Sequence, residues 1–86
     1  MLQLIYLMSK KVYEIISRVM NVPLKEITDQ SGPETIETWD SFNGLVLVDD
    51  LEAEFNISFT LDEVIDVKTI SDIKRHLTTH GVLLDD

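Results

Sequence analysis

The sequence predicts an all-α fold, a bundle of three principal helices and one short helix with a long first loop. Three segments place apolar residues at the three- and four-residue spacing of a helix face, and no run alternates long enough to predict a convincing strand. The chain has 86 residues and no cysteine, so a domain of this size must rely on compact helix packing rather than on disulfides. Helix packed on helix is the architecture that these features permit.

The first helix is predicted between Ser9 and Pro23. Serine is a typical N-cap residue, and a proline ring cannot continue the helical hydrogen-bond ladder. One face between these two residues carries apolar side chains at helical spacing, namely Val12, Ile15, Ile16, Val19 and Met20. The apolar residues 1–8 are too short to span a bilayer and lack the features of a signal peptide. We therefore expect an N-terminal extension at 1–8, a domain at 9–80, an acidic tail at 81–86 and a cytoplasmic location.

Residues 23–39 are predicted to form a long connection, with a turn at Ser31-Gly32-Pro33. Asp40 can cap a second helix that runs to about Phe55. On a helical wheel its core stripe consists of Leu47, Val48, Leu51 and Phe55. The opposite side carries Phe42, Val46, Asp49 and Ala53. This helix therefore has apolar residues on a face that the core cannot use.

Two further helices follow. Thr60 and Glu63 match the capping-box pattern and predict a short helix over residues 61–66. Thr69 resembles another helix start, and the last helix has the apolar stripe Ile70, Ile73 and Leu77 before it ends at Gly81.

The charge is strongly acidic and unevenly distributed. The formal net charge is −9, and residues 26–67 contain 12 acids and no lysine or arginine. Such a field repels nucleic acid and anionic membranes and attracts basic protein surfaces. We therefore expect protein partners with basic docking surfaces, and neither nucleic acid nor membrane.

No pattern of residues supports catalysis or a metal site. His76 and His80 lie four residues apart, but neither has an acidic third ligand at motif spacing. Ser41 lacks the flanking glycines of a nucleophile elbow, and no glycine-rich phosphate loop is present. The sequence therefore predicts a non-catalytic protein without a metal.

Ser41 is instead a candidate attachment point, because it opens a helix whose free N–H groups favour an anionic phosphate ester. The stretch Trp39-Asp40-Ser41-Phe42, followed by Leu47 to Ile57, resembles the acyl carrier protein family, which includes peptidyl and D-alanyl carriers. The resemblance extends from roughly Ser9 to Leu77. It implies a four-helix bundle in which a separate phosphopantetheinyl transferase attaches 4′-phosphopantetheine from coenzyme A to Ser41. The thiol of that arm would carry a thioester.

The resemblance also implies a partner-binding surface around this serine, made of Asp40, Phe42, Val46, Asp49 and Glu52. Phe42 replaces the usual leucine, Val46 stands where fatty-acid carriers often have glutamate, and Asp49 where they often have methionine. Glu52 matches a recognition glutamate, whereas Ala53 replaces the next one. Gly44 is unusual inside a helix, and we interpret it either as the entrance for the arm and its cargo or as a site of close helix packing.

The function that follows is a stand-alone, monomeric acyl carrier in fatty acid, polyketide or specialised lipid or metabolite synthesis. Its expected partners are the transferase and acyl-transferring or adenylating enzymes. One alternative is a peptidyl or D-alanyl carrier that an adenylating enzyme loads. Another is an unmodified helical interaction domain, against which the intact Asp40-Ser41 pair argues.

Overall fold

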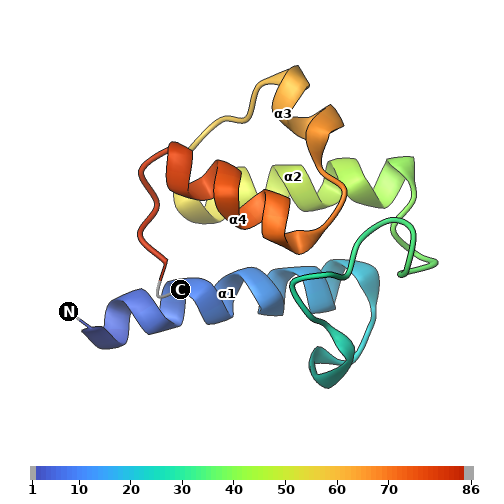
Figure 1. Cartoon of the computed structure of the whole chain (residues 1–86), viewed down its shortest axis with the longest axis horizontal. Coiled ribbons are helices and arrows are strands. Elements are labelled where there is room, and N and C mark those ends of the chain that lie inside the picture. Colours follow the sequence, from blue (N-terminus) through green and yellow to red (C-terminus); the bar gives the residue numbers. More distant parts are fainter. Residues whose placement is uncertain (1, 85–86) are drawn as a thin grey trace.

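The computed structural model describes the backbone of residues 2–84 and the side chains of residues 9–84. It contains four α-helices and a short 3₁₀ helix: α1 (Leu2–Met20), η1 (Leu24–Glu26), α2 (Ser41–Phe55), α3 (Leu61–Asp66) and α4 (Ile70–Thr79). No strand occurs among the described residues. In Figure 1, α1 runs along one side of the molecule, α2 and α4 lie above it, and α3 lies on the side away from α1. The predicted all-helical bundle with one short helix is confirmed.

The predicted start of the first helix is wrong. Helix α1 begins at Leu2, so Ser9 lies inside it and is only 5% exposed. A serine acts as an N-cap only where the preceding backbone leaves helical geometry. No glycine or proline interrupts residues 2–8, and leucine, glutamine and methionine all favour a helix. At its other end α1 stops at Met20 as the sequence predicts, and Asn21 adopts a left-handed φ of 56° before Pro23.

The remaining helix ends agree with the predictions. The Asp40 side chain accepts a hydrogen bond from Asn43 N at 2.8 Å, and Thr60 and Glu63 form a capping box at the start of α3. Gly81 follows α4 with a φ of 92°, which a glycine tolerates without strain. Local sequence signals therefore set these boundaries.

The core forms where α1, α2, α4 and the long loop meet. Its buried apolar side chains come from these four segments and from the residues after α4: Val12, Ile15, Ile16, Met20, Ile27, Ile36, Trp39, Leu47, Leu51, Ile70, Ile73, Leu77 and Val82. Val82 belongs to the predicted acidic tail, yet it is 8% exposed and packs with this cluster. The core therefore extends past the end of α4.

The long loop is fixed to the start of α4 by backbone hydrogen bonds. Ile70 N donates to Ser31 O at 2.9 Å, and Ser71 N donates to Asp29 O at 3.0 Å. These bonds satisfy two of the N–H groups that the first turn of a helix leaves without an intrahelical partner. The part of the loop that precedes α2 is thus held against α4.

A polar cluster joins the same loop to α1 and α4. The Tyr13 hydroxyl donates to the Asp29 carboxylate, and Lys74 Nζ lies 3.0 Å from the Tyr13 oxygen and 3.2 Å from Asp29 Oδ1. The hydrogen bond from Tyr13, supported by Lys74, lowers the pKa of the Asp29 carboxyl despite its partial burial. Lys74 is therefore buried with its charge compensated.

Candidate functional site

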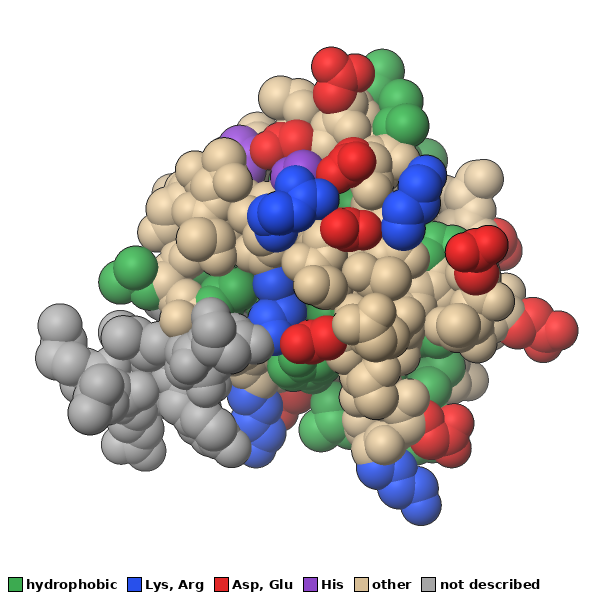
Figure 2. All heavy atoms as spheres, viewed as in Figure 1, with side chains coloured by type: hydrophobic (Ala, Val, Ile, Leu, Met, Phe, Trp, Pro, Cys, Tyr) green, Lys and Arg blue, Asp and Glu red, His purple; other side chains and the backbone are tan. Residues whose placement is uncertain are grey.

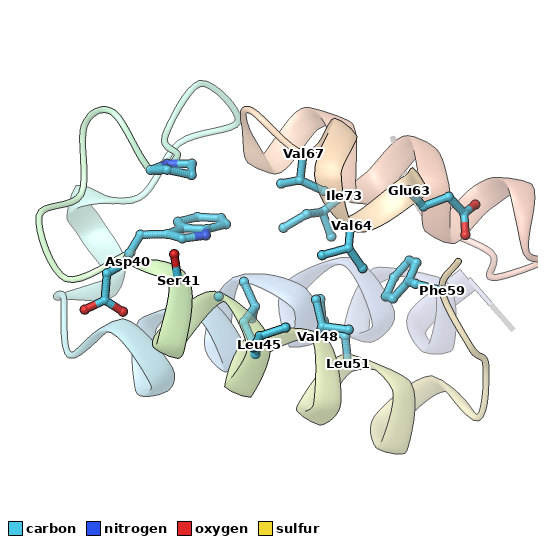
Figure 3. Close-up of a pocket in the computed structure, with 14 residues that line it drawn as sticks. Asp40, Ser41, Leu45, Val48, Leu51, Phe59, Glu63, Val64, Val67 and Ile73 are labelled. Atoms are coloured by element: carbon cyan, nitrogen blue, oxygen red, sulfur yellow. The ribbon is translucent and has the colours of Figure 1, made fainter. Parts of the chain in front are cut away.

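A largely apolar pocket of about 480 Å³ lies between α2, α3 and the end of the long loop. Figure 3 shows Asp40 and Ser41 at one end and Phe59 and Glu63 at the other. The lining residues are Pro33, Trp39, Asp40, Ser41, Gly44, Leu45, Leu47, Val48, Leu51, Phe59, Glu63, Val64, Val67 and Ile73. Most of these side chains are apolar, so the pocket suits an apolar ligand segment.

Ser41 lies at the opening of this pocket as the first residue of α2. Its side chain is exposed, and its hydroxyl has no hydrogen-bond partner in the part of the chain that the structure describes. Figure 3 shows the hydroxyl turned toward the pocket and the Asp40 carboxylate turned away from it. Asp40 therefore caps the helix, while Ser41 remains free for an external group.

Three hydrogen bonds position the start of α2 relative to α1. Thr38 Oγ1 donates to Met20 O at 2.6 Å, at the last residue of α1. Asn43 Nδ2 donates to Thr38 O at 2.8 Å, and Asn43 N donates to the Asp40 carboxylate. Ser41 lies between these anchors, so its backbone is held in place even though its side chain is exposed. The sequence alone does not indicate this role of Thr38 and Asn43, because the anchor depends on tertiary contact with α1.

Helix α3 forms one side of the pocket and is attached to α4 and its C-cap residue by hydrogen-bonded side-chain pairs. His80 Nε2 lies 2.8 Å from Glu63 Oε1, His76 Nε2 lies 3.0 Å from Asp66 Oδ2, and Arg75 donates to Asp66 at 2.8 Å. Figure 2 shows histidine, basic and acidic side chains gathered over α3 and α4. Spacing along the sequence does not indicate an acidic partner for the histidines, whereas the fold brings Glu63 and Asp66 into hydrogen-bond contact with them. No group of side chains suited to hold a metal ion occurs among the described residues.

These pairs shift the titration of the α3 carboxylates. The hydrogen bond from His80, with that from the Thr60 backbone, lowers the pKa of Glu63. Hydrogen bonds from Arg75 and then from His76 lower the pKa of Asp66. Both carboxylates therefore bind a proton less readily in the folded protein than in the unfolded chain.

Loss of stability in acid is the expected consequence. A lowered pKa in the folded state stabilises the fold above the pKa of the unfolded group, and this contribution disappears as the pH falls through the folded value. We expect the free energy of unfolding, measured with urea, to fall below a pH of about 4.3, the ordinary pKa of glutamate. Glu63→Gln should reduce this fall, leaving the part due to Asp29, Asp66 and Asp72, whose pKa values are also lowered. An unchanged pH profile in this variant would refute the role of Glu63.

The side chains of the predicted partner-binding residues differ in exposure and in whether they are already hydrogen-bonded. Phe42 is 73% exposed, Asp49 is exposed and Val46 is half-buried, all on the side of α2 away from the core. The carboxylate of Glu52 instead accepts a hydrogen bond from Phe59 N at 2.8 Å. Asp40 is likewise occupied by its cap. A basic partner could reach Glu52 only by sharing its carboxylate with this backbone N–H.

Gly44 lies on the pocket side of α2. A Cβ atom at this position would be 3.7 Å from Trp39 Nε1 and 3.8 Å from Trp39 Cδ1, which is ordinary van der Waals contact. The helix does not require glycine here for close packing against backbone. The sequence alone does not indicate Trp39 or Leu45 as pocket residues, because Trp39 precedes α2 and Leu45 lies outside its core stripe.

Comparisons with known proteins agree with this geometry. A family model described as "Phosphopantetheine attachment site" matches residues 10–77. An acyl carrier protein from Azobacteroides pseudotrichonymphae genomovar. CFP2 is 32% identical over 74 residues, covering 85% of this chain and 87% of the relative.

The fold also resembles a solved structure. A protein from Mycobacterium tuberculosis, provisionally assigned as an acyl carrier protein, superposes with a TM-score of 0.76. At 22% identity, over 85% of this chain and 97% of that one, this likeness concerns the fold. No helix among the described residues has the length and apolar character needed to cross a membrane.

Proposed function

Because the chain belongs to the acyl carrier protein family, whose members are non-catalytic and carry a covalently attached 4′-phosphopantetheine, we propose that Ser41 bears this arm. When bound, the arm supplies a thiol that holds cargo as a thioester. The protein itself presents the arm to partner enzymes. The observation that carries the assignment is the unpaired Ser41 hydroxyl at the opening of the apolar pocket.

The residues around Ser41 fit such a group. The N–H groups in the first turn of a helix carry partial positive charge, which favours the phosphodiester that joins the arm to the serine. The Asp40 carboxylate is directed to Asn43 N, so its charge is partly compensated. The exposed serine side chain also gives the transferase direct access.

Intact mass tests this assignment. After incubation with coenzyme A and a broad-specificity phosphopantetheinyl transferase, the protein should gain the mass of one phosphopantetheinyl group. A protein that gains no mass, while a known carrier protein in the same tube is modified, would overturn the proposal.

The cargo that the pocket favours is an acyl chain. Val48, Leu51, Val64 and Ile73 offer apolar contacts along the pocket, which begins at the attachment point. Burial of each methylene group contributes about 0.8 kcal/mol, so a medium-length chain gains several kcal/mol by entering. An aminoacyl cargo would bring a charged ammonium group into the same apolar space at a cost. This contrast supports the acyl carrier over the peptidyl or D-alanyl carrier.

Gly44 is proposed as the entrance to this pocket. Leucine at this position should leave loading of Ser41 unchanged but fill the space that the chain would use. Octanoylation should shift the amide resonances of Leu51 and Ile73 in the parent protein, and these shifts should be lost in Gly44→Leu. Gly44→Ala is the matched control, since its Cβ meets Trp39 only at van der Waals distance. Equal shifts in all three proteins would contradict the proposed entrance.

Members of this family interact with phosphopantetheinyl transferases and acyl-handling enzymes. We further propose that such partners dock on the α2 strip, defined as Phe42, Val46 and Asp49. Apolar contact with Phe42 and Val46 would supply affinity, and Asp49 would orient a basic partner surface. The position of the strip beside Ser41, together with the exposure of Phe42, supports this assignment.

Val46→Lys is expected to lower the kcat/KM of a partner acting on the loaded protein by about tenfold, because it removes an apolar contact and places a cation in a basic interface. Thermal unfolding should change little. Leu83→Lys is the matched control, because Leu83 is also apolar and 65% exposed but lies outside α2. Unchanged turnover for Val46→Lys, or an equal loss in both variants, would place the interface elsewhere.

A further inference from the structure

Trp39 has a polar atom for which the fold supplies no partner. The residue is 7% exposed, and its indole ring lines the pocket next to Ser41 and Gly44. The indole Nε1–H makes no hydrogen bond within the described residues. An indole nitrogen is a donor only, so it needs an acceptor and cannot use a neighbouring N–H.

No fully buried side-chain nitrogen or oxygen of the described residues lacks a hydrogen-bond partner. The Trp39 nitrogen must therefore remain accessible, and the pocket that the ring lines is the space it opens to. The donor is therefore available to an acceptor that enters the pocket, and a Trp N–H group in a mostly buried ring usually has such a partner.

The other polar side chains that line the pocket are already committed. Glu63 accepts from Thr60 N at 2.8 Å and pairs with His80, and Asp40 accepts from Asn43 N. The Ser41 oxygen becomes the phosphodiester oxygen when the arm is attached. Among the described lining side chains, Trp39 therefore offers the one donor that remains for a ligand inside the pocket.

We propose that Trp39 Nε1–H donates a hydrogen bond to a carbonyl oxygen of the chain attached to Ser41, and so positions that chain at the pocket opening. The inference rests on the proposed function. The position of Gly44 indicates where the acceptor lies. A Cβ atom added to Gly44, one helical turn after Ser41, would be 3.7 Å from the Trp39 nitrogen. The acceptor is thus a carbonyl near the start of the pocket. The arm amides, the thioester and a 3-oxo group on the cargo all offer this chemistry.

The chain contains a single tryptophan, so ¹⁵N-labelled protein gives one indole N–H resonance. The spectra to compare are those of the protein without the arm (apo), with the arm (holo), and with a hexanoyl or a 3-oxohexanoyl group on the arm. We expect the indole resonance to move downfield in the form in which the hydrogen bond first occurs. A shift that first occurs in the holo form identifies an amide of the arm. A first shift in the hexanoyl form identifies the thioester, and one in the 3-oxohexanoyl form alone identifies the 3-oxo group.

An indole resonance that stays in place in all four forms would overturn the role of Trp39. The intact mass of each sample separates this outcome from failure of the proposed function, since a protein that gains no mass has not been loaded at all.

Trp39→Phe provides a second readout, because phenylalanine keeps an aromatic ring but has no donor. Once intact mass shows that the variant is loaded, hydroxylamine should cleave its acyl thioester about three- to tenfold faster than in the parent where the acceptor is an arm amide or a 3-oxo group, because the chain leaves the pocket more often after loss of one net hydrogen bond. Where the acceptor is the thioester carbonyl itself, cleavage should instead become slower, because the lost donor no longer polarises that carbonyl. Equal cleavage rates in a folded variant would count against the proposal. Should the variant fail to fold, the indole spectrum of the parent protein still decides the question.

Discussion

Replacing Ser41 with alanine is expected to abolish phosphopantetheine loading completely while leaving the bundle folded. The side chain is exposed and makes no hydrogen bond to the described residues, so its removal leaves no cavity and no unpaired group. The N-cap bond from Asn43 N to Asp40 does not involve Ser41 and should survive. Loading by the transferase should fall below detection, and the thermal midpoint should match that of the parent.

Ser58→Ala is the matched control for this variant. Ser58 is also exposed but lies in the connection between α2 and α3. It should be loaded at the parental rate. Residual modification of Ser41→Ala, or loss of modification in the Ser58 variant, would show that the arm is attached to another residue.

Gly32→Ala, which adds a single methyl group, is expected to lose more stability than any other variant proposed for this protein. A Cβ atom there would overlap the carbonyl oxygen of Lys68 and lie 3.2 Å from Thr69 Cα. Both neighbours are backbone atoms, so neither can rotate away. The loop would have to separate from the start of α4, which weakens the bonds from Ile70 N to Ser31 O and from Ser71 N to Asp29 O.

For Gly32→Ala we expect a loss of about 3 kcal/mol in the free energy of unfolding, from overpacking and from weakened backbone hydrogen bonds. In a domain of this size that corresponds to a fall of roughly 10–25 °C in Tm. Gly44→Ala serves as the opposite control, because its Cβ has room and alanine favours a helix by about 1 kcal/mol over glycine. If Gly32→Ala unfolds at the same urea concentration as the parent, the close approach of the two backbones is wrong.

The sequence predicts most of the fold because its signals are local. The caps at Asp40 and Thr60 and the stop at Gly81 lie within a few residues of the boundaries they set. Ser9 shows where such signals fail, because a residue that can cap a helix does so only if the chain before it is not helical.

What the sequence could not predict depends on contacts between distant residues. A lysine on the last helix is expected to face solvent, yet Lys74 is buried because Tyr13 and Asp29, 61 and 45 residues away, provide its partners. The histidines show the same limit. Asp72, four residues before His76, accepts from the backbone N–H groups of Lys68 and Thr69, whereas α3 brings Glu63 and Asp66 into contact with the histidines.

The same distinction between local signals and long-range contacts applies to the candidate site. Ser41 and the outward position of Phe42 follow from one helix and its register, and so the sequence indicates them. The pocket requires α2, α3 and the end of the long loop together. Its unpaired Trp39 donor is therefore visible only in the folded structure.

Locating the added group within the modified protein tests the central claim most directly. The protein would be loaded with coenzyme A and a transferase, digested, and its peptides fragmented in a mass spectrometer. The account predicts one phosphopantetheinyl group, carried by the fragment ions that contain Ser41. A group located on any other side chain, or none on a protein exposed to an active transferase, would contradict it.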